Sequence, residues 1–249
     1  MPIRLFASDL DGTLLSFSGD TAASQRFSAA WQAVPVGERP LLCYNSGRLA
    51  NDLREAAHKG GLPPSDYLFG GVGTTLVDRN GRIVREYQEQ FRPGWDRSLV
   101  VEVLSSIKGA KRQPERFQSP FKSSWFLLNA SAELLAEIRE RLRTVELDVT
   151  VVYSSARDLD IVPAAADKGN AIRWLCDHLG YSLNEVVVAG DTGNDSSMFR
   201  LPNINGIAVG NAREELIEAT AGCRVLHTAA PEADGVIEGL THYGVFAKA

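Results

Sequence analysis

The chain has 249 residues, a net charge of −5 and a pI near 5.5, with 44% hydrophobic and 23% charged residues. This length suits one large domain or two smaller ones. The negative charge argues against non-specific binding to nucleic acid or anionic membranes, and no apolar run approaches the length that spans a bilayer. Cys43, Cys176 and Cys223 are odd in number and widely spaced, which favours free thiols in a reducing cytoplasm over disulfides.

The first apolar run, residues 3–7, is typical of a buried parallel strand, and two aspartates follow it. In an open α/β sheet, side chains just past the carboxyl ends of strands line the binding crevice. Asp9 is therefore a candidate nucleophile that could carry an aspartyl-phosphate. Asp11 is a candidate acid that protonates the leaving oxygen and later activates water. The alternative is an ordinary Asp-Gly turn.

A helix is predicted from about Ala22 to near Pro35, and a second buried strand over residues 41–44. This strand ends in Asn45-Ser46-Gly47-Arg48. The Ser46 hydroxyl could hydrogen-bond a transferring phosphoryl oxygen, and Gly47 lets backbone N–H groups approach the same anion. Arg48 is a candidate substrate contact. An Asn-Ser-Gly turn without function is the alternative.

The parallel pattern continues with a helix over residues 49–59 and a third strand over residues 67–69. Asn80-Gly81 then predicts a hairpin between strands at 74–77 and 82–87. The hairpin interrupts the α/β alternation.

Residues from about 88 to 162 have the pattern of an inserted α+β unit. We expect a helix with an apolar stripe over residues 95–107, an irregular basic stretch over 108–122, and a second helix from Ser131. Strands are expected at residues 124–128, 149–153 and 159–162. This predicts a small antiparallel sheet covered by two helices, which we interpret as a lid.

The α/β pattern resumes after Pro163, and two further polar clusters appear. Lys168 begins a helix, where its charge opposes the helix dipole and calls for a local anion. A buried strand at 186–189 leads into a Gly-rich loop that contains Asp191 and Asp195, a set that suits a hard cation. An N-capped helix start at Asp195 is the alternative. Strands and helices at 206–209, 214–220, 224–226 and 234–242 complete the pattern.

The four clusters DLDGTLL, NSGR, Lys168 and GDTGND stand in the order of the four motifs of the haloacid-dehalogenase-like hydrolases, which this chain resembles. That superfamily consists mostly of Mg²⁺-dependent phosphatases and phosphotransferases. The resemblance implies an α/β fold: a doubly wound, Rossmann-like parallel core over residues 1–80 and 163–249, with an inserted α+β cap over 81–162. The implied catalytic residues are Asp9, Asp11, Ser46 and Lys168; the implied Mg²⁺ ligands are Asp9, Asp11 through its backbone carbonyl, Asp191 and Asp195.

Several shorter segments look most like the sucrose-phosphate phosphatase branch: Val72-Gly73-Thr74, the run at 119–123, Ser154-Ser155 with Asp158 and Asp160, and Lys168-Gly169-Asn170-Ala171. This implies hydrolysis of a disaccharide phosphate such as sucrose 6-phosphate, supplied by a glycosyltransferase. Mannosylfructose-phosphate phosphatase is the alternative, and a phosphomannomutase-type phosphotransferase a more distant one. A disaccharide carries more hydroxyls than the core motifs can recognise, so the cap should supply contacts, with Lys122 the first candidate. The candidate substrate contacts are Arg48, Thr74, Gln118, Lys122, Ser124, Ser154, Arg157, Asp158 and Asn194.

Overall fold

The computed structural model describes residues 2–154 and 156–247, with only the main chain of Ser154. The described chain divides into two compact units. The core unit comprises Met1–Ile83 and Lys168–Ala249, and the inserted unit comprises Val84–Asp167. The insertion expected from the sequence covered residues 81–162, so both observed boundaries lie slightly further along the chain.

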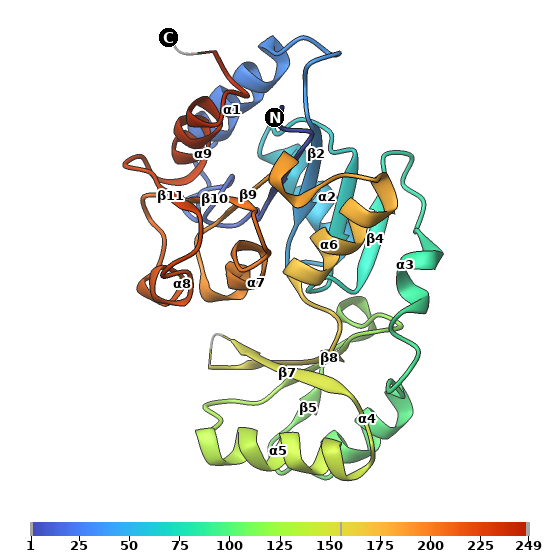
Figure 1. Ribbon diagram of the computed structural model, residues 1–249. Helices are drawn as coiled ribbons and strands as arrows, with labels where there is room; N and C mark the ends of the chain where they lie inside the picture. The colour runs from blue at the N-terminus through green and yellow to red at the C-terminus, as the bar shows by residue number, and fades with distance from the viewer. Residues whose placement is uncertain (1, 155, 248–249) are drawn as a thin grey trace. The chain divides into compact units, whose positions relative to one another are not determined.

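A seven-stranded sheet forms the centre of the core unit, in the order β11-β10-β9-β1-β2-β3-β4 (Figure 1). All neighbouring strands are parallel except β4, which pairs antiparallel with β3 at one edge. The sheet confirms the expected doubly wound α/β fold, and its central strands are apolar because both faces are covered. The strands are β1 (Leu5–Ser8), β2 (Leu41–Asn45), β3 (Tyr67–Gly70), β4 (Thr75–Asp78), β9 (Val186–Gly190), β10 (Asn205–Ala208) and β11 (Val225–His227).

Helices cover both faces of this sheet (Figure 1). Adjacent residues on β10 point to opposite faces: a Cβ on Gly206 would lie 2.5 Å from Phe199 of α7, while Ile207 lies against Gly239 of α9. One face therefore carries α9 with α1 and α2, and the other carries α7 with α6. The helices of this unit are α1 (Ala22–Ala33), α2 (Ala50–Lys59), α6 (Lys168–Leu179), α7 (Ser196–Phe199), α8 (Glu214–Ala219) and α9 (Glu232–His242).

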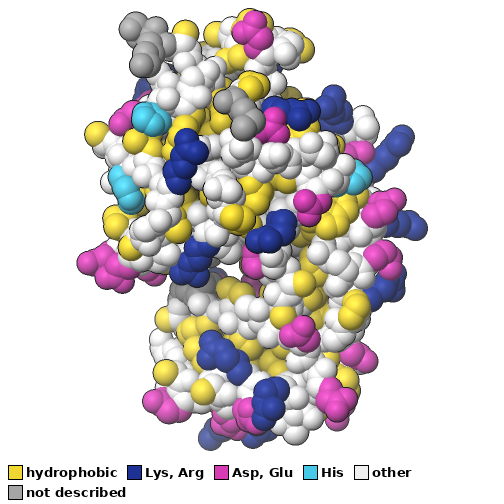
Figure 2. Space-filling view, in the orientation of Figure 1, with side chains coloured by type: hydrophobic (Ala, Val, Ile, Leu, Met, Phe, Trp, Pro, Cys, Tyr) yellow, Lys and Arg dark blue, Asp and Glu magenta, His cyan; other side chains and the backbone are white. Residues whose placement is uncertain are grey.

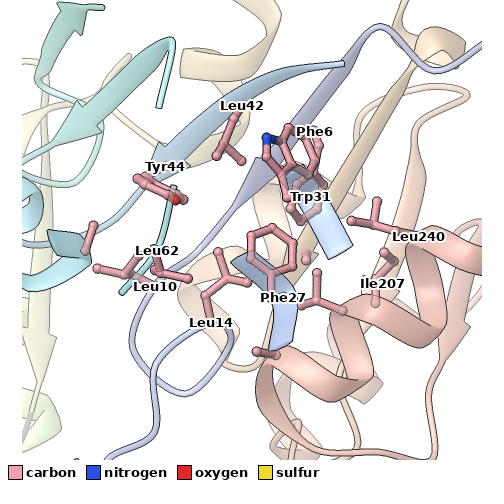
Figure 3. Packing of buried hydrophobic residues seen from close by; sticks show 14 of the residues in the cluster. Phe6, Leu10, Leu14, Phe27, Trp31, Leu42, Tyr44, Leu62, Ile207 and Leu240 are labelled. Carbon is pink, nitrogen blue, oxygen red and sulfur yellow. The ribbon is translucent and has the colours of Figure 1, made fainter. Parts of the chain in front are cut away.

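An aromatic cluster joins α1 to the central strand (Figure 3). The ring of Phe6 on β1 lies 6.1 Å from that of Phe27 and 5.9 Å from that of Trp31, centroid to centroid. Leu240 of α9 and Ile207 of β10 complete the packing, and both are fully buried. Each large apolar side chain buried in this way contributes about 1.5–3 kcal/mol. This packing fixes β1, the strand that leads into the first aspartate motif, against α1.

The inserted unit has a four-stranded antiparallel sheet in the order β5-β6-β8-β7. Helices α4 and α5 pack on it through a separate apolar core that includes Trp125, Ile138 and Leu159. Local capping defines both helices: Asp96 accepts N–H bonds at the start of α4, and Ser131 does so for α5. The elements are α3 (Arg85–Glu89), α4 (Arg97–Ser105), β5 (Lys111–Arg112), β6 (Ser123–Phe126), α5 (Ala132–Thr144), β7 (Val149–Ser154) and β8 (Asp158–Pro163).

Two expected elements differ from the structure. The hairpin predicted at Asn80-Gly81 forms only in part: Val77 and Ile83 make an isolated antiparallel bridge, and the Asp78 N–H donates to the Arg82 carbonyl, but α3 begins at Arg85. A second hairpin, which was not predicted, joins β3 to β4 through Gly71, Val72 and Gly73, all of which adopt positive φ. The stretch 108–122, expected to be irregular, contains the short strand β5, which pairs with β6.

Acidic and basic side chains are interspersed over the face shown in Figure 2. Within the described chain, no helix has the length and apolar character required to cross a membrane.

Candidate active site

The candidate site lies at the carboxyl ends of the three central strands of the core unit. Ser8 of β1 is level with Tyr44 of β2 and with Ala189 of β9. Asp9, Ser46 and Asp191 therefore all follow strand ends at the same edge of the sheet, and Asn45 is the last residue of β2 there. Ligands bind at this edge in open α/β folds. The structure brings together the first, second and fourth motifs at this edge.

Lys168, the first residue of α6, lies between two carboxylates. Its Nζ is 2.6 Å from Asp9 Oδ1 and 2.5 Å from Asp195 Oδ1. All three side chains are buried, with Lys168 only 1% exposed. The Lys168 carbonyl accepts a hydrogen bond of 2.9 Å from Asn45 Nδ2, so β2 helps to fix the start of the helix. The anion that a lysine at this position required is thus a pair of carboxylates.

Burial and charge shift the pKa values of these groups. Burial raises the pKa of Asp9 to about 7, although Lys168 opposes the shift. Burial also raises the pKa of Asp191 to about 6, and the neighbouring Asp195 adds to this effect. Burial disfavours the ammonium of Lys168, but Asp195 and Asp9 outweigh it and raise the lysine pKa above its ordinary value. Three carboxylates around one ammonium leave an excess of negative charge.

The loop after β9 is organised by Asp195. Its Oδ2 accepts the N–H groups of Asp191 and Thr192 at 3.0 and 3.1 Å. Thr192 and Asp195 form a capping box around the 3-10 turn Gly193–Asp195. Asp195 also occupies the N-cap position of α7, as the expected alternative had it, but its side chain makes no capping hydrogen bond there. Gly190 is required here because a Cβ would lie 2.6 Å from the Asp195 side chain.

The carboxylates of Asp9, Asp191 and Asp195 each place an oxygen within 4.8 Å of the others. This donor set fits a hard divalent cation such as Mg²⁺, which prefers a few carboxylate oxygens and completes its shell with water. Asp195 accepts hydrogen bonds from Lys168 at Oδ1 and from backbone N–H groups at Oδ2. Both of its oxygens are therefore already occupied, and it holds Lys168 and the loop after β9 in place. Asp9 Oδ2 and Asp191 Oδ2 accept no hydrogen bond from the part of the chain that the structure describes, and they are the oxygens available to a cation.

Thr13 is a site residue that sequence reasoning missed. Its hydroxyl donates a 3.1 Å hydrogen bond to Asp191 Oδ1, and the side chain is fully buried. The two residues are 178 positions apart, so only the strand order β9-β1 could have indicated the contact. Thr13 directs the other oxygen of Asp191 toward the site.

Asp11 forms a separate pair with Arg48 rather than joining the buried cluster. Arg48 Nε and Nη2 lie 2.6 and 2.7 Å from the two oxygens of the Asp11 carboxylate. Both side chains are partly exposed, and the pair links the loop after β1 with the loop after β2. Two residues expected to act on the same phosphate ester thus contact each other.

Ser46 is buried just past the end of β2, and its Oγ accepts the N–H of Arg48 at 3.2 Å. The hydroxyl proton is left to donate to a second group. Asn194 is exposed and accepts a hydrogen bond from Thr192. Thr74 is buried in the turn between β3 and β4, where its hydroxyl donates to the Gly71 carbonyl at 2.9 Å.

Lys122 of the inserted unit is buried, with its Nζ 3.0 Å from Asp160 Oδ2. Lys122 is therefore not a solvated surface charge, although it lies in a stretch rich in basic residues. Asp158 accepts hydrogen bonds from Arg157 and from Gln113 Nε2, the latter at 3.0 Å. Charged and polar groups are thus held together along β8 and the segment before β6.

The other candidates of this unit contact its own backbone. The Gln118 side chain donates to the Ser124 carbonyl and accepts the Ser124 N–H, at 2.8 and 2.9 Å. The Ser124 hydroxyl donates to the Phe117 carbonyl at 2.9 Å. The side chain of Ser154 lies outside the described residues.

The four motifs thus meet at one edge of a doubly wound sheet, as in the haloacid-dehalogenase-like hydrolases that the sequence resembles. Residues 2–244 match the family model described as sucrose-6F-phosphate phosphohydrolase. The chain belongs to this family, whose members are phosphoric monoester hydrolases, and it is a sugar-phosphate phosphatase.

The relatives agree with this assignment. The chain is 46% identical to mannosylfructose-phosphate phosphatase of Agrobacterium fabrum (strain C58) over 98% of both chains. It is 31% identical to sucrose-phosphatase 1 of Nicotiana tabacum, covering 97% of this chain and 59% of that protein. Among solved structures, the sucrose-phosphatase of Synechocystis sp. PCC6803 in complex with sucrose and phosphate has a TM-score of 0.86 at 26% identity, covering 100% of both chains.

Proposed function

We propose that this protein hydrolyses the phosphate ester of a disaccharide through a covalent aspartyl-phosphate on Asp9. The observation that carries the proposal is the contact of Lys168 with Asp9 at 2.6 Å at the carboxyl end of β1. The Asp9 carboxylate and the substrate phosphate are both anions and would repel each other. The buried Lys168 ammonium reduces this repulsion and leaves the second oxygen of Asp9 free to attack phosphorus.

In the first step, an Asp9 oxygen attacks phosphorus, and the bond between phosphorus and the sugar oxygen breaks. Asp11 gives its proton to the departing oxygen, so the sugar leaves as a neutral alcohol. In the second step, Asp11 takes a proton from water, which attacks phosphorus and breaks the bond to Asp9. Inorganic phosphate leaves and Asp9 is regenerated.

Fixed groups of the core unit stabilise the transferring phosphoryl group. Lys168 supplies a buried positive charge, and Ser46 supplies a hydroxyl whose own acceptor oxygen already holds the N–H of Arg48. Asp9, Asp191 and the Asp11 carbonyl would hold Mg²⁺, which when bound neutralises phosphoryl charge. Arg48 can exchange Asp11 for a substrate phosphate oxygen, which would release Asp11 for proton transfer.

The inserted unit is proposed to recognise the sugar. A disaccharide presents many hydroxyls, and a site that hydrogen-bonds them rejects analogues by leaving its own polar groups unpaired. Lys122 and Asp160 offer donors and acceptors already oriented by their mutual contact at 3.0 Å. Arg157 and Asp158 form a second such pair. Of these groups, Lys122 is the first candidate because burial limits its movement.

Two disaccharide phosphates are candidates. Mannosylfructose phosphate is supported by the relative that is 46% identical over 98% of both chains. Sucrose 6-phosphate is supported by the family model that matches residues 2–244. Either substrate requires a glycosyltransferase that joins a sugar to a fructose phosphate, which would supply this enzyme. A cytoplasmic location accords with the three free cysteines, Cys43, Cys176 and Cys223.

A phosphate-release assay tests the proposal. The purified protein with Mg²⁺ would be given mannosylfructose phosphate, sucrose 6-phosphate, fructose 6-phosphate and glucose 6-phosphate, and kcat/KM compared. We expect a disaccharide phosphate to exceed both hexose phosphates by about a hundredfold, because a site built to bind hydroxyls discriminates strongly against their loss. Equal values for all four substrates would contradict a disaccharide specificity. Dependence of turnover on added glucose 1,6-bisphosphate would instead indicate a phosphomannomutase-type transferase.

A further inference from the structure

Asn211 lies in the loop after β10 and joins two distant segments through its side chain. Its Nδ2 donates a hydrogen bond of 2.8 Å to the Gly12 carbonyl, in the loop after β1. Its Oδ1 accepts the N–H of Glu232, the first residue of α9, at 2.7 Å. One side-chain amide thus links the first aspartate motif, near the N-terminus, to α9, the last helix of the described chain.

The Gly12 backbone lies directly against the proposed cation site. Gly12 has φ of +83°, and a Cβ added to it would lie 2.3 Å from Asp191 Oδ2. This oxygen is one of those available to a cation. A small shift of the Gly12 peptide therefore moves the main chain of the Asp11 loop against the Asp191 carboxylate.

The loop after β10, which carries Asn211, and the first turn of α8 also contact the segment after β9. The N–H of Arg213 donates to the Asp191 carbonyl at 2.7 Å, and Glu215 accepts the N–H of Gly193 at 3.1 Å. The loop thus contacts both segments that would hold the cation. Asn211 is in turn held at the start of α9 by the N–H of Glu232.

We infer that Asn211 is a positioning residue for the cation site: its donated hydrogen bond fixes the Gly12 peptide and so the spacing between the Asp11 loop and Asp191. This inference rests on the proposed function for the cation and the nucleophile. It does not depend on which sugar the substrate carries. A catalytic constellation loses much of its rate when its parts move by fractions of an ångström, and groups that orient ligands typically contribute about 10–100-fold to metal affinity or activity.

The competing explanation is that Asn211 only satisfies the free N–H at the start of α9. The Asn211→Asp variant distinguishes the two explanations. This variant keeps the acceptor for Glu232 but loses the donor to Gly12. Its added negative charge would by itself tighten Mg²⁺ binding, so weaker binding would report the lost hydrogen bond. Asn211→Ala removes both contacts. Arg26→Met is the matched control, because it removes the two hydrogen bonds from Arg26 to Asp234 of α9 and leaves the hydrogen bond from Asn211 to Gly12 in place.

The test measures turnover of p-nitrophenyl phosphate, the Mg²⁺ concentration that gives half of the maximal thermal stabilisation, and the Tm without Mg²⁺. For Asn211→Asp we expect turnover to fall about tenfold and the half-maximal Mg²⁺ concentration to rise about tenfold, with the metal-free Tm near that of the parent. Asn211→Ala should show the same losses with a lower metal-free Tm. Arg26→Met should keep the parental turnover and the parental half-maximal Mg²⁺ concentration.

The inference is overturned if Asn211→Asp retains parental turnover and Mg²⁺ response, or if Arg26→Met loses as much as the Asn211 variants. If Asn211→Ala does not fold, Asn211→Asp alone decides. A parental enzyme that turns over p-nitrophenyl phosphate in excess chelator and gains no stability from Mg²⁺ would instead overturn the proposed cation site. The two failures are thus distinguishable.

Discussion

Replacing Lys168 by methionine should destabilise the protein and abolish turnover. Lys168 is 1% exposed, and its Nζ contacts both Asp9 and Asp195 within 2.6 Å. Methionine keeps most of the volume but leaves two buried carboxylates without their cation. Removing one partner of a buried ion pair costs about 3–5 kcal/mol, because the remaining charge is desolvated and unpaired. We expect a loss of that size in the free energy of unfolding at about pH 8, where Asp9 with its pKa of about 7 is ionised.

The loss should shrink as the pH falls. The pKa of Asp9 is raised above its unfolded value, so the folded state binds the proton more tightly, and protonation below about pH 7 removes the charge that Lys168 neutralises. Urea unfolding at about pH 8 and about pH 5.5, without metal, measures both values. Lys59→Met is the control: Lys59 pairs with Glu55 at 2.5 Å but is 73% exposed, so little change is expected. A loss for Lys168→Met that is equal at both pH values, or no greater than that of the control, would show that Lys168 does not stabilise the protein by neutralising Asp9.

Two further predictions concern the sugar and the metal. Lys122→Ala should raise the KM for the disaccharide phosphate about tenfold or more and leave the KM for p-nitrophenyl phosphate nearly unchanged, because only a substrate with sugar hydroxyls needs the inserted unit. Equal effects on both KM values would show that other residues determine the specificity. The Mg²⁺ concentration that gives half of the maximal thermal stabilisation should rise as the pH falls from about 8 to about 6. Protons compete with the cation for Asp9 and Asp191, whose pKa values are about 7 and about 6. A half-maximal concentration that does not change with pH would contradict a cation at these carboxylates.

The parts of the site that could be predicted from sequence are those that strand ends determine. Asp9, Ser46 and Asp191 each follow an apolar run, and parallel strands place their carboxyl ends at one edge. Lys168 could be predicted because a cation at a helix start needs a partner, and the structure supplies Asp9 and Asp195. Local patterns were sufficient in these cases.

The parts that could not be predicted depend on register and on distant contacts. Lys122 meets Asp160 only because β6 pairs with β8 in a register that places Ser124 opposite Asp160. The contact of Asn211 with Gly12 spans 199 positions. The hairpin predicted at Asn80-Gly81 makes only one bridge, between Val77 and Ile83, because the chain enters α3 at Arg85, and the neighbouring turn at Gly71-Val72-Gly73 was not predicted.

Covalent trapping shows directly whether Asp9 is the nucleophile. Asp11→Asn should slow hydrolysis of the intermediate because it lacks the base that activates water, so this variant would be mixed with p-nitrophenyl phosphate, quenched in acid, reduced with borohydride and mapped by mass spectrometry. Reduction of the acyl phosphate should yield homoserine at position 9, and no homoserine should form when Asp9 is also replaced by Asn. A phosphorylated Ser46, or full turnover by the Asp9→Asn single variant, would contradict it.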